Sequence, residues 1–327
     1  MVKVLVIGAA GMVGRKLTAA LLQAGQIGGK DLTSLLLADV VAPPLPSSSL
    51  DVTVTEADLS APGAAERLLA DRPGIIFHLA AVVSGEAEAD FEKGYRINLD
   101  GTRLLLEAIR ALHAEDGYTP RLIFTSSIAV FGAPFPSKIG DTHHHTPLTS
   151  YGTQKAIGEL LLADYSRRGF VDGVGIRLPT IVVRPGAPNK AASGFFSGIL
   201  REPLAGKDAV LPVDPSVRHW FASPRAAVGF LLHAAGLDAR LLGAQRTLTM
   251  PGLSATVSEE IAALERVAGA EPVSRIRHEP DETIATIVAG WPQDFNARRA
   301  LELGFRGDAD FDEIIRIHIE DELGGSR

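Results

Sequence analysis

The sequence predicts an α/β fold: a doubly wound parallel sheet of Rossmann type with a smaller, mostly C-terminal lobe. Over about the first 180 residues, short runs rich in Val, Ile and Leu alternate with amphipathic stretches. A glycine-rich turn follows the first apolar run, and the periodicity becomes irregular after Leu178. Alternation of this kind is typical of a parallel sheet covered by helices on both faces.

The expected strands are short buried runs, and the expected helices carry an apolar face at helical spacing. The strands are predicted at residues 2–7, 35–39, 75–79, 122–126 and 174–178. The helices are predicted at residues 15–24, 64–70, 101–113 and 153–167, and two more at 258–268 and 311–323.

This pattern predicts two structural units. Residues 1–180 form the nucleotide-binding domain, and residues 222–252 return to it. Residues 181–221 and 253–327 form the second lobe, in which Pro- and Gly-rich segments suit loops that shape a substrate pocket.

Composition excludes several classes of function. The chain has 327 residues, a formal net charge of −7 and no cysteine, and no block of like charges stands out. Nucleic acid and anionic membranes are therefore not expected partners, and thiolate metal sites and cysteine nucleophiles are excluded. No apolar run approaches the roughly 20 residues of a membrane span. We expect a cytoplasmic protein, because a cysteine-free chain is compatible with a reducing compartment.

The glycine turn predicts a bound dinucleotide. Gly8, Gly11 and Gly14 follow the first strand and open a helix, with Met12 and Val13 in its first turn. A pyrophosphate needs closely approaching backbone N–H groups and the positive end of a helix, and side chains at the tight positions would block it. The alternative is an ordinary glycine-rich turn.

Asp39 predicts the choice of cofactor. It ends the second predicted strand, where a carboxylate accepts hydrogen bonds from the adenosine ribose and repels a 2′-phosphate. No arginine or lysine lies beside it, so NAD is favoured over NADP. The alternative is an aspartate that faces water.

A Tyr-x-x-x-Lys pattern predicts the reacting groups. Tyr151 and Lys155 are four residues apart and therefore share one helical face. An ammonium beside a phenol stabilises phenolate and lowers its pKa, so Tyr151 can exchange a proton with substrate. Ser127, at the end of a predicted strand, can hydrogen-bond the same substrate oxygen. A surface pair is the alternative.

Several segments together resemble the extended short-chain dehydrogenase/reductase family, the group of nucleoside-diphosphate-sugar epimerases and dehydratases. They are Gly8/Gly11/Gly14, His78-Leu-Ala-Ala81, Asn98-Leu-Asp-Gly-Thr102, Thr125-Ser-Ser-Ile-Ala-Val-Phe-Gly132 and Tyr151-x-x-x-Lys155. The resemblance implies that Tyr151 is the catalytic base, Ser127 its hydrogen-bonding partner, and Lys155 a bridge between phenolate and nicotinamide ribose. It further implies cofactor contacts at Met12, Val13, Asp39, Asp58, Leu59, Ala80, Ala81 and Asn98, with Ser126 and Pro179 near the nicotinamide.

Departures from the family pattern bear on the substrate. Dehydratases of the family place Asp-Glu after the catalytic hydroxyl residue, but this chain has Ile128-Ala129, which cannot transfer protons. Many epimerases carry asparagine where this chain has Thr180. The resemblance is stronger to members that oxidise the C2 hydroxyl of a small sugar acid. A sugar-nucleotide epimerase or reductase, and a non-catalytic NAD-binding sensor, remain alternatives.

A sugar acid needs a cation for its carboxylate. Arg184 and Arg218 are the candidates, because a guanidinium matches a carboxylate with two parallel hydrogen bonds. Ser84 and Glu86 are candidates for contacts with substrate hydroxyls, together with Ser127. Either arginine could instead anchor a loop.

Three further features of the sequence are expected to have structural roles. The run His143-His144-His145 is assigned to a polar loop, because adjacent histidines rarely converge on one metal ion, and no metal is expected. His78, Trp220 and Trp291 are expected to be packing residues. The leucine runs at 104–106 and 160–162 are expected to pack in the core between helices and sheet. Some of these leucines could also face a second copy, since members of the family commonly form homodimers through these two helices.

Overall fold

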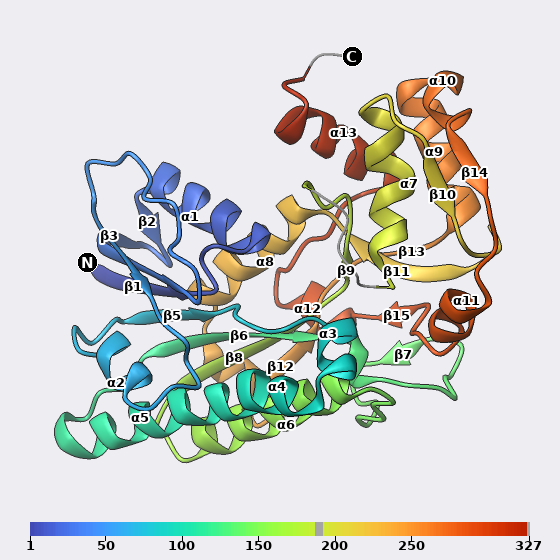
Figure 1. Cartoon of the computed structure of the whole chain (residues 1–327). Coiled ribbons are helices and arrows are strands. Elements are labelled where there is room, and N and C mark those ends of the chain that lie inside the picture. Colours follow the sequence, from blue (N-terminus) through green and yellow to red (C-terminus); the bar gives the residue numbers. More distant parts are fainter. Residues whose placement is uncertain (187–191, 326–327) are drawn as a thin grey trace.

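A computed structural model of the chain describes residues 1–186 and 192–325, and Figure 1 shows the arrangement of its elements. The main sheet has eight strands in the order β12-β8-β6-β5-β1-β3-β2, with β4 also paired to β3. Its pairs are parallel except the short β2–β3 hairpin. The strands are β1 (Val2–Ile7), β2 (Gln26–Ile27), β3 (Lys30–Asp39), β4 (Asp51–Glu56), β5 (Ile75–His78), β6 (Arg121–Ser127), β8 (Asp172–Leu178) and β12 (Thr247–Thr249).

Helices cover both faces of this sheet, as predicted. On one face α1 (Met12–Ala24) packs beside α8 (Pro224–Gly236), and their apolar side chains share a core cluster with those of the strands. The other face carries α2 (Ala64–Leu68), α5 (Gly101–Asp116) and α6 (Ser150–Arg167), seen below the sheet in Figure 1. Short helices α3 (Ser84–Ala89) and α4 (Phe91–Gly94), a π-helix at Tyr95–Asp100 and a 3-10 helix at Ile128–Val130 lie before or beside α6.

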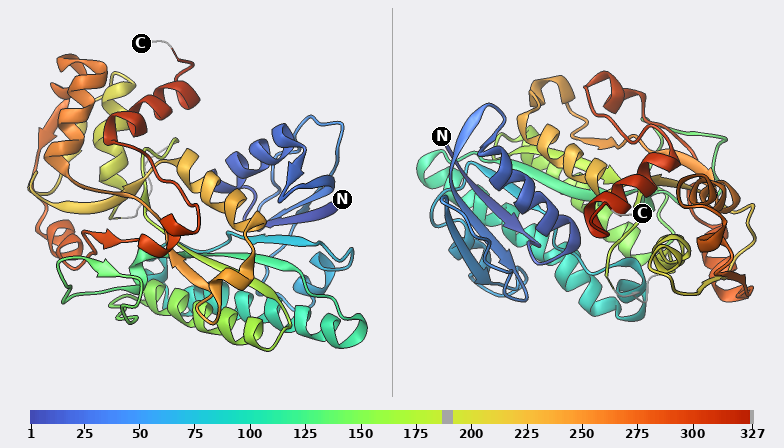
Figure 2. Two further views of the ribbon diagram at one scale, coloured as in Figure 1. Left: turned by 180° about the vertical axis from the view of Figure 1, so that it is seen from behind. Right: turned by 90° about the horizontal axis from the view of Figure 1, so that it is seen from above.

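The second lobe has its own apolar core and lies at one end of the main sheet (yellow to red in Figures 1 and 2). Its sheets are β13-β11-β9 and β10-β14. Its elements are β9 (Thr180–Ile181), α7 (Gly194–Leu204), β10 (Ala209–Leu211), β11 (Arg218–Ala222), β13 (Leu253–Thr256), α9 (Val257–Ala268), α10 (Ala270–Val273), β14 (Ile276–His278), α11 (Glu282–Ala289) and α13 (Phe311–Glu322).

Helix ends follow local chemistry. Gly25, at φ 62, ends α1 by donating its N–H to the carbonyl of Leu21. Thr256 and Glu259 form a reciprocal capping box at the start of α9. Ser223 caps α8 through the N–H of Ala226, with Pro224 at the first helical position, where its missing N–H costs no hydrogen bond.

Several boundaries differ from the prediction. β3 starts at Lys30 rather than at residue 35, and neither α7 nor α8 was predicted as a helix. The predicted return of residues 222–252 to the main domain corresponds in the structure to α8, a 3-10 helix at Ala239–Leu242 and β12, which pairs with β8.

The segment after α11 does not keep to the second lobe. β15 (Phe295–Asn296) pairs with β7 (Ile139–Gly140), and α12 (Arg298–Glu302) follows it. Ala300 and Phe305 lie in the core cluster of the main sheet. Lys16 on α1 pairs with Glu322 on α13 at 2.6 Å, which ties the last helix to the first.

Candidate active site

The glycine turn has the shape that a pyrophosphate requires. Gly8 has φ 95, and a Cβ there would lie 2.6 Å from the backbone nitrogen of Ala80. A Cβ on Gly14 would lie 2.2 Å from the carbonyl oxygen of Gly8, whereas at Gly11 the nearest atom is 3.4 Å away. No described side chain caps the first turn of α1, so its N–H groups, including those of Met12 and Val13, face an open edge. The turn therefore fits a dinucleotide phosphate.

Asp39 ends β3 beside this turn. Its Oδ2 accepts the N–H of Ala10 at 2.9 Å, and its Oδ1 accepts the N–H of Val40 at 2.7 Å. Each carboxylate oxygen keeps a further lone pair for a ribose hydroxyl. The side chain thus holds the glycine turn and remains able to bind a ligand.

Asn98 fixes the loop that follows β5. It is 2% exposed; its Oδ1 accepts the N–H of Val82 at 2.9 Å, and its Nδ2 donates to the carbonyl of Val82 and to Oε1 of Gln154. Through these bonds it positions the half-buried Ala80 and Ala81 against α6. The contribution of Gln154 was not predicted.

Asp58 and Leu59 lie just beyond β4 and differ in their surroundings. Leu59 is buried in the core beneath α5. Asp58 accepts hydrogen bonds from Ser60 and pairs with Arg96 at 2.9 Å, a partner that the sequence did not reveal. Arg96 belongs to the π-helix, so this pair links that helix to the segment that follows β4.

Tyr151 and Lys155 share one face of α6, whose first turn Thr149 caps through the N–H of Gly152. The Lys155 ammonium lies 5.7 Å from the centre of the Tyr151 ring and donates to the carbonyl of Thr125 at 2.8 Å. Burial lowers the pKa of Lys155 to about 8, while the negative charge of Glu159 opposes that shift. The lysine is therefore a buried cation at the carboxyl end of β6.

The expected acidification of Tyr151 by Lys155 is not what the structure shows. Burial raises the pKa of Tyr151 to about 12; a hydrogen bond with the Ser127 hydroxyl and the positive charge of Arg184 lower it. The ammonium of Lys155 is directed to a carbonyl instead, so the cation that acts on the phenol is Arg184.

Ser126 and Ser127, which are adjacent on β6, have different hydrogen-bond partners. Ser127 ends the strand, accepts the N–H of Ala129 at 3.1 Å and interacts with the Tyr151 phenol. Ser126 is 3% exposed, and its hydroxyl donates to Oε1 of Glu159 at 2.5 Å. Pro179, buried between β8 and β9, completes this edge.

Arg184 is a partly buried guanidinium without an acidic partner among the described residues. Its Nη2 donates to the Ser193 hydroxyl at 2.9 Å, and its carbonyl accepts Nη1 of Arg201 at 2.7 Å. Burial and the nearby charge of Arg201 lower its pKa. Residues 187–191, outside the described part, contain no Asp or Glu.

The other predicted substrate residues are placed differently. The Arg218 guanidinium donates to the carbonyl of Ser254 at 2.9 Å and pairs with Glu259 at 3.3 Å, both in the second lobe. Glu86 on α3 pairs with Lys93 at 2.5 Å and is exposed. Ser84 begins α3 and is half-buried. Arg218 and Glu86 thus each have a partner of opposite charge, whereas Arg184 has none among the described residues.

His78 is packed in the core, as predicted, and the 143–145 run lies in the loop before α6. His78 is 1% exposed, its Nε2 lies 2.9 Å from the Thr102 hydroxyl, and burial lowers its pKa to about 3, so it is neutral. His145 lies 2.8 Å from Glu159. No group of three potential metal-binding side chains occurs among residues 1–186 and 192–325.

Glu159 and Arg177 form a buried pair that sequence reasoning missed. The Arg177 guanidinium contacts both carboxylate oxygens of Glu159, at 2.7 to 3.1 Å, and lies 4.9 Å from the centre of the Phe131 ring. The available signal was Glu159 itself, one helical turn beyond Lys155 on the same face.

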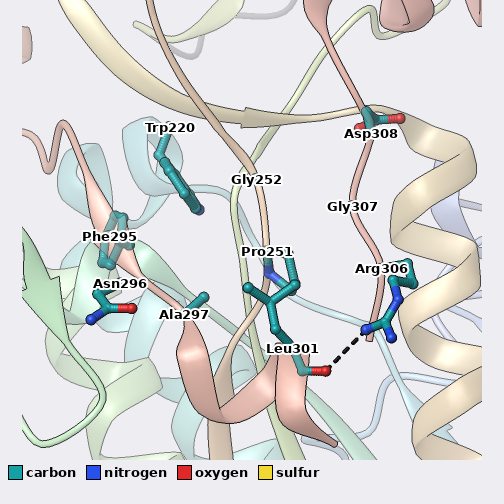
Figure 3. A pocket seen from close by; sticks show the side chains of 10 residues that line it. All are labelled: Trp220, Pro251, Gly252, Phe295, Asn296, Ala297, Leu301, Arg306, Gly307 and Asp308. Carbon is teal, nitrogen blue, oxygen red and sulfur yellow. Dashed lines mark hydrogen bonds between the residues drawn. The ribbon is translucent and has the colours of Figure 1, made fainter. Parts of the chain in front are cut away.

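A cavity of about 300 Å³ lies apart from these groups, between β11 and the 295–308 segment (Figure 3). Its lining residues include Trp220, Phe295 and Arg306, and none of the predicted site residues. Trp220 is 6% exposed and donates its Nε1–H to the carbonyl of Met250 at 3.3 Å, consistent with the predicted packing role. Within the described part of the chain, no helix is both long and apolar enough to cross a bilayer.

The fold and this site define a nucleotide-binding α/β protein of the short-chain dehydrogenase/reductase class. Residues 4–222 match the NAD dependent epimerase/dehydratase family. The chain belongs to that family.

Three relatives are similar over nearly their whole length. A Cupriavidus necator protein named D-erythronate dehydrogenase is 50% identical over 97% of this chain and 98% of its own. A Haemophilus influenzae protein of the same name is 42% identical over 98% of this chain and 100% of its own. The crystal structure of a protein described as nucleoside-diphosphate-sugar epimerase from Agrobacterium tumefaciens is 63% identical, covers 99% of this chain and 95% of its own, and superimposes with a TM-score of 0.98.

Proposed function

We propose that this protein is an NAD-dependent dehydrogenase that oxidises the C2 hydroxyl of D-erythronate to 2-oxo-tetronate. The observation that carries the proposal is the guanidinium of Arg184, which has no acidic partner among the described residues and whose positive charge acts on the phenol of Tyr151. Two relatives that match nearly the whole chain carry the name D-erythronate dehydrogenase.

The cofactor site follows from the glycine turn and the residues around it. NAD, when bound, supplies the acceptor for the hydride that leaves C2. The residues that would hold it are Gly8, Gly11, Met12, Val13, Gly14, Asp39, Asp58, Leu59, Ala80, Ala81, Asn98, Ser126, Tyr151, Lys155 and Pro179. The Asp39 carboxylate favours NAD over NADP, because it would repel a 2′-phosphate.

The residues of the chain perform the proton chemistry. Tyr151, as phenolate, takes the proton of the C2 hydroxyl while Ser127 donates a hydrogen bond to the oxygen that becomes a carbonyl. Lys155, held by the carbonyl of Thr125, provides a fixed positive charge near the phenolate. Arg184 adds a second positive charge at the phenol and lowers its pKa.

Arg184 also explains why the substrate is an acid. A partly buried cation without a counter-ion is costly, and a ligand carboxylate would remove that cost through two charge-assisted hydrogen bonds. Ser193 accepts a hydrogen bond from the guanidinium and Arg201 donates one to the Arg184 backbone carbonyl, so the residue is held in place where a small anion could bind it. Arg218 is the weaker candidate because Glu259 already neutralises it.

A sugar-nucleotide epimerase or reductase is the second candidate, and the description of the Agrobacterium tumefaciens structure favours it. Thr180 weighs against it: the hydroxyl lies 2.6 Å from Nε2 of the buried His219, so it is not free to replace the asparagine of many epimerases. A non-catalytic sensor is disfavoured because the chain retains both Tyr151 and Lys155.

Two further expectations accompany this function. A homodimer through α5 and α6 is consistent with Leu160, which is 62% exposed on α6. The absence of cysteine remains compatible with a cytoplasmic location.

A substrate screen tests the proposal. Purified protein is mixed with NAD and each of the four- to six-carbon aldonates, UDP-sugars and dTDP-sugars, and nicotinamide absorbance is followed. We expect reduction of NAD with D-erythronate and none with sugar nucleotides. Turnover of a sugar nucleotide alone contradicts the proposal.

The role of Arg184 has its own test. Arg184→Met should raise the KM for D-erythronate by about 100-fold, since two charge-assisted hydrogen bonds are lost, and leave the Kd of NAD within a factor of about three. Arg277→Met is the control, because Arg277 is exposed and pairs with Asp208 at the surface of the second lobe. An equal KM in both variants would remove Arg184 from the substrate site.

A further inference from the structure

A buried polar network surrounds the Glu159 carboxylate, one turn beyond Lys155. Glu159 is 3% exposed. It accepts hydrogen bonds from the Ser126 hydroxyl at 2.5 Å and from Nη2 of Arg177 at 2.7 Å, and Nε2 of His145 lies 2.8 Å away. These partners come from β6, β8 and the loop before α6, so one side chain joins three segments of the site to the catalytic helix.

The network reaches the reacting groups along two routes. Along α6, Tyr151, Lys155 and Glu159 follow one another at spacings of four and therefore line one helical face. Along β6, the network holds Ser126, the residue immediately before Ser127. The carbonyl of Thr125, one residue earlier, accepts the Lys155 ammonium. Glu159 is thus connected to Tyr151 and Lys155 along α6 and to Ser127 through Ser126.

The carboxylate is ionised in spite of its burial. Burial alone would raise the pKa of Glu159, but hydrogen bonds from His145 and Arg177 and the charge of Arg177 bring it below its usual value. Arg177 itself is 7% exposed and contacts Thr249 on β12 at 3.4 Å. A buried ion pair of this kind adds little stability compared with apolar side chains of the same volume. A gain in stability therefore does not explain why this ion pair lies beside the catalytic lysine.

The groups that face Lys155 show how the negative charge of Glu159 acts on the lysine. They are Tyr151 and Glu159 on α6, Phe124 and Thr125 on β6, and the neutral His78 on β5. Of these only Glu159 carries a negative charge while the phenol is protonated. Burial lowers the pKa of Lys155 to about 8, and Glu159 limits that fall. Without the charge of Glu159, the pKa of Lys155 would fall further.

We propose that Glu159, fixed by Arg177 and His145, is a positioning residue for hydride transfer: it holds the end of β6 that carries Ser127 and supplies the buried negative charge opposite the Lys155 ammonium. This role deepens the proposed dehydrogenase function and rests on it. Glu159 contacts no reacting atom and acts only through Lys155 and Ser126.

The first experiment replaces the charge and keeps the shape. In Glu159→Gln, the titration of Lys155, followed by NMR of the ligand-free protein labelled with 13Cε-lysine, should move to lower pH by roughly one unit. The alkaline limb of the kcat profile with D-erythronate should move in the same direction, and kcat at neutral pH should fall about tenfold with little change in the KM for NAD. The NMR readout needs no substrate, so it remains valid if the proposed substrate is wrong.

Two further variants separate position from stability. Asp172→Asn, which removes a carboxylate of comparable chemistry at the opposite end of β8, should leave the Lys155 titration unchanged. Glu159→Gln/Arg177→Met removes both buried charges and should recover Tm relative to Glu159→Gln, because no unpaired cation remains. The double variant should nevertheless keep the shifted Lys155 titration. Recovery of both Tm and the wild-type titration in the double variant, or no shift in Glu159→Gln, overturns the proposal.

Discussion

The two ends of the strand pair β6–β8 carry similar chemistry and serve different purposes. At the amino end Arg121 lies opposite Asp172, and at the carboxyl end Ser126 lies opposite Arg177, each as partners in the same parallel ladder. Each end holds a carboxylate that accepts hydrogen bonds from arginine. The amino-end cluster stabilises the fold, whereas the carboxyl-end cluster acts on the active site.

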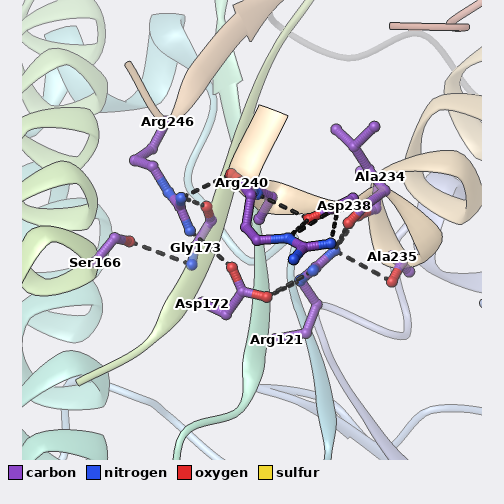
Figure 4. Close-up of polar contacts among 11 residues, drawn as sticks. Arg121, Ser166, Asp172, Gly173, Ala234, Ala235, Asp238, Arg240 and Arg246 are labelled. Atoms are coloured by element: carbon purple, nitrogen blue, oxygen red, sulfur yellow. Dashed lines mark hydrogen bonds and ion pairs between the residues drawn. The ribbon is translucent and has the colours of Figure 1, made fainter. Parts of the chain in front are cut away.

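The amino-end cluster holds the sheet to its neighbours (Figure 4). Asp172 accepts Nη2 of Arg121 at 2.6 Å and Nη2 of Arg246 at 2.7 Å. Nη1 of Arg121 also donates to the carbonyls of Ala234 and Leu237, where α8 ends and its last carbonyls lack helical partners. The Asp172 side chain is 35% exposed, and these donors are committed to the protein itself.

The carboxyl-end cluster is buried more deeply and adjoins the reacting groups. The side chains of Glu159 and Arg177 are 3% and 9% exposed, and Lys155 lies one helical turn away. In a parallel sheet the loops that follow the carboxyl ends form the crevice in which ligands bind. The same type of ion pair therefore acts on stability at one end and on a catalytic lysine at the other.

The largest expected effect on kcat comes from replacing the phenol of Tyr151, which lies beside the carboxyl-end cluster. Tyr151→Phe should lower kcat by about a thousandfold or more, because the proton acceptor is lost, while Tm and NAD affinity stay close to those of the wild type. Absorbance of reduced nicotinamide measures the rate, and calorimetry measures binding. Residual activity above about one tenth would place the base elsewhere.

The second-largest effect is expected from a methyl group in the glycine turn, which should weaken NAD binding. In Gly14→Ala the new Cβ would lie 2.2 Å from the carbonyl oxygen of Gly8, so the turn must open. We expect the Kd of NAD to rise at least about 30-fold as the N–H groups lose their alignment. Gly229→Ala on α8 is the control, because its Cβ meets open space and alanine favours a helix. Equal NAD affinity in the two variants would show that the turn tolerates a side chain.

The smallest effect is expected at the amino end. Asp172→Asn should lower the free energy of unfolding by about 1–2 kcal/mol, since charge-assisted hydrogen bonds from two arginines weaken at a partly exposed site. Denaturant unfolding measures this change. The value of kcat should be unaffected, and a fall in kcat comparable to that of Glu159→Gln would end the distinction between the two ends.

The fold class, the glycine turn and the tyrosine–lysine helix could all be predicted from the amino-acid order alone. These depend on local patterns, since strand alternation, glycines at tight positions and a spacing of four are encoded within a few residues. The same limit explains the missed α7 and α8. α7 contains Gly198 and Pro203, which disfavour a helix locally, and α8 is apolar with only a weak polar face, so both helices depend on packing against distant elements.

Which charged side chains lie next to one another could be learned only from the folded chain. Arg184 and Arg218 looked equivalent in the sequence, but folding places Glu259 beside Arg218 and leaves Arg184 near Tyr151 without an acidic partner among the described residues. Likewise Lys155 turns to the carbonyl of Thr125, and Glu159 collects partners from β6, β8 and the loop before α6. The physical reason is that electrostatic interactions depend on distance and burial, and neither is fixed by order along the chain.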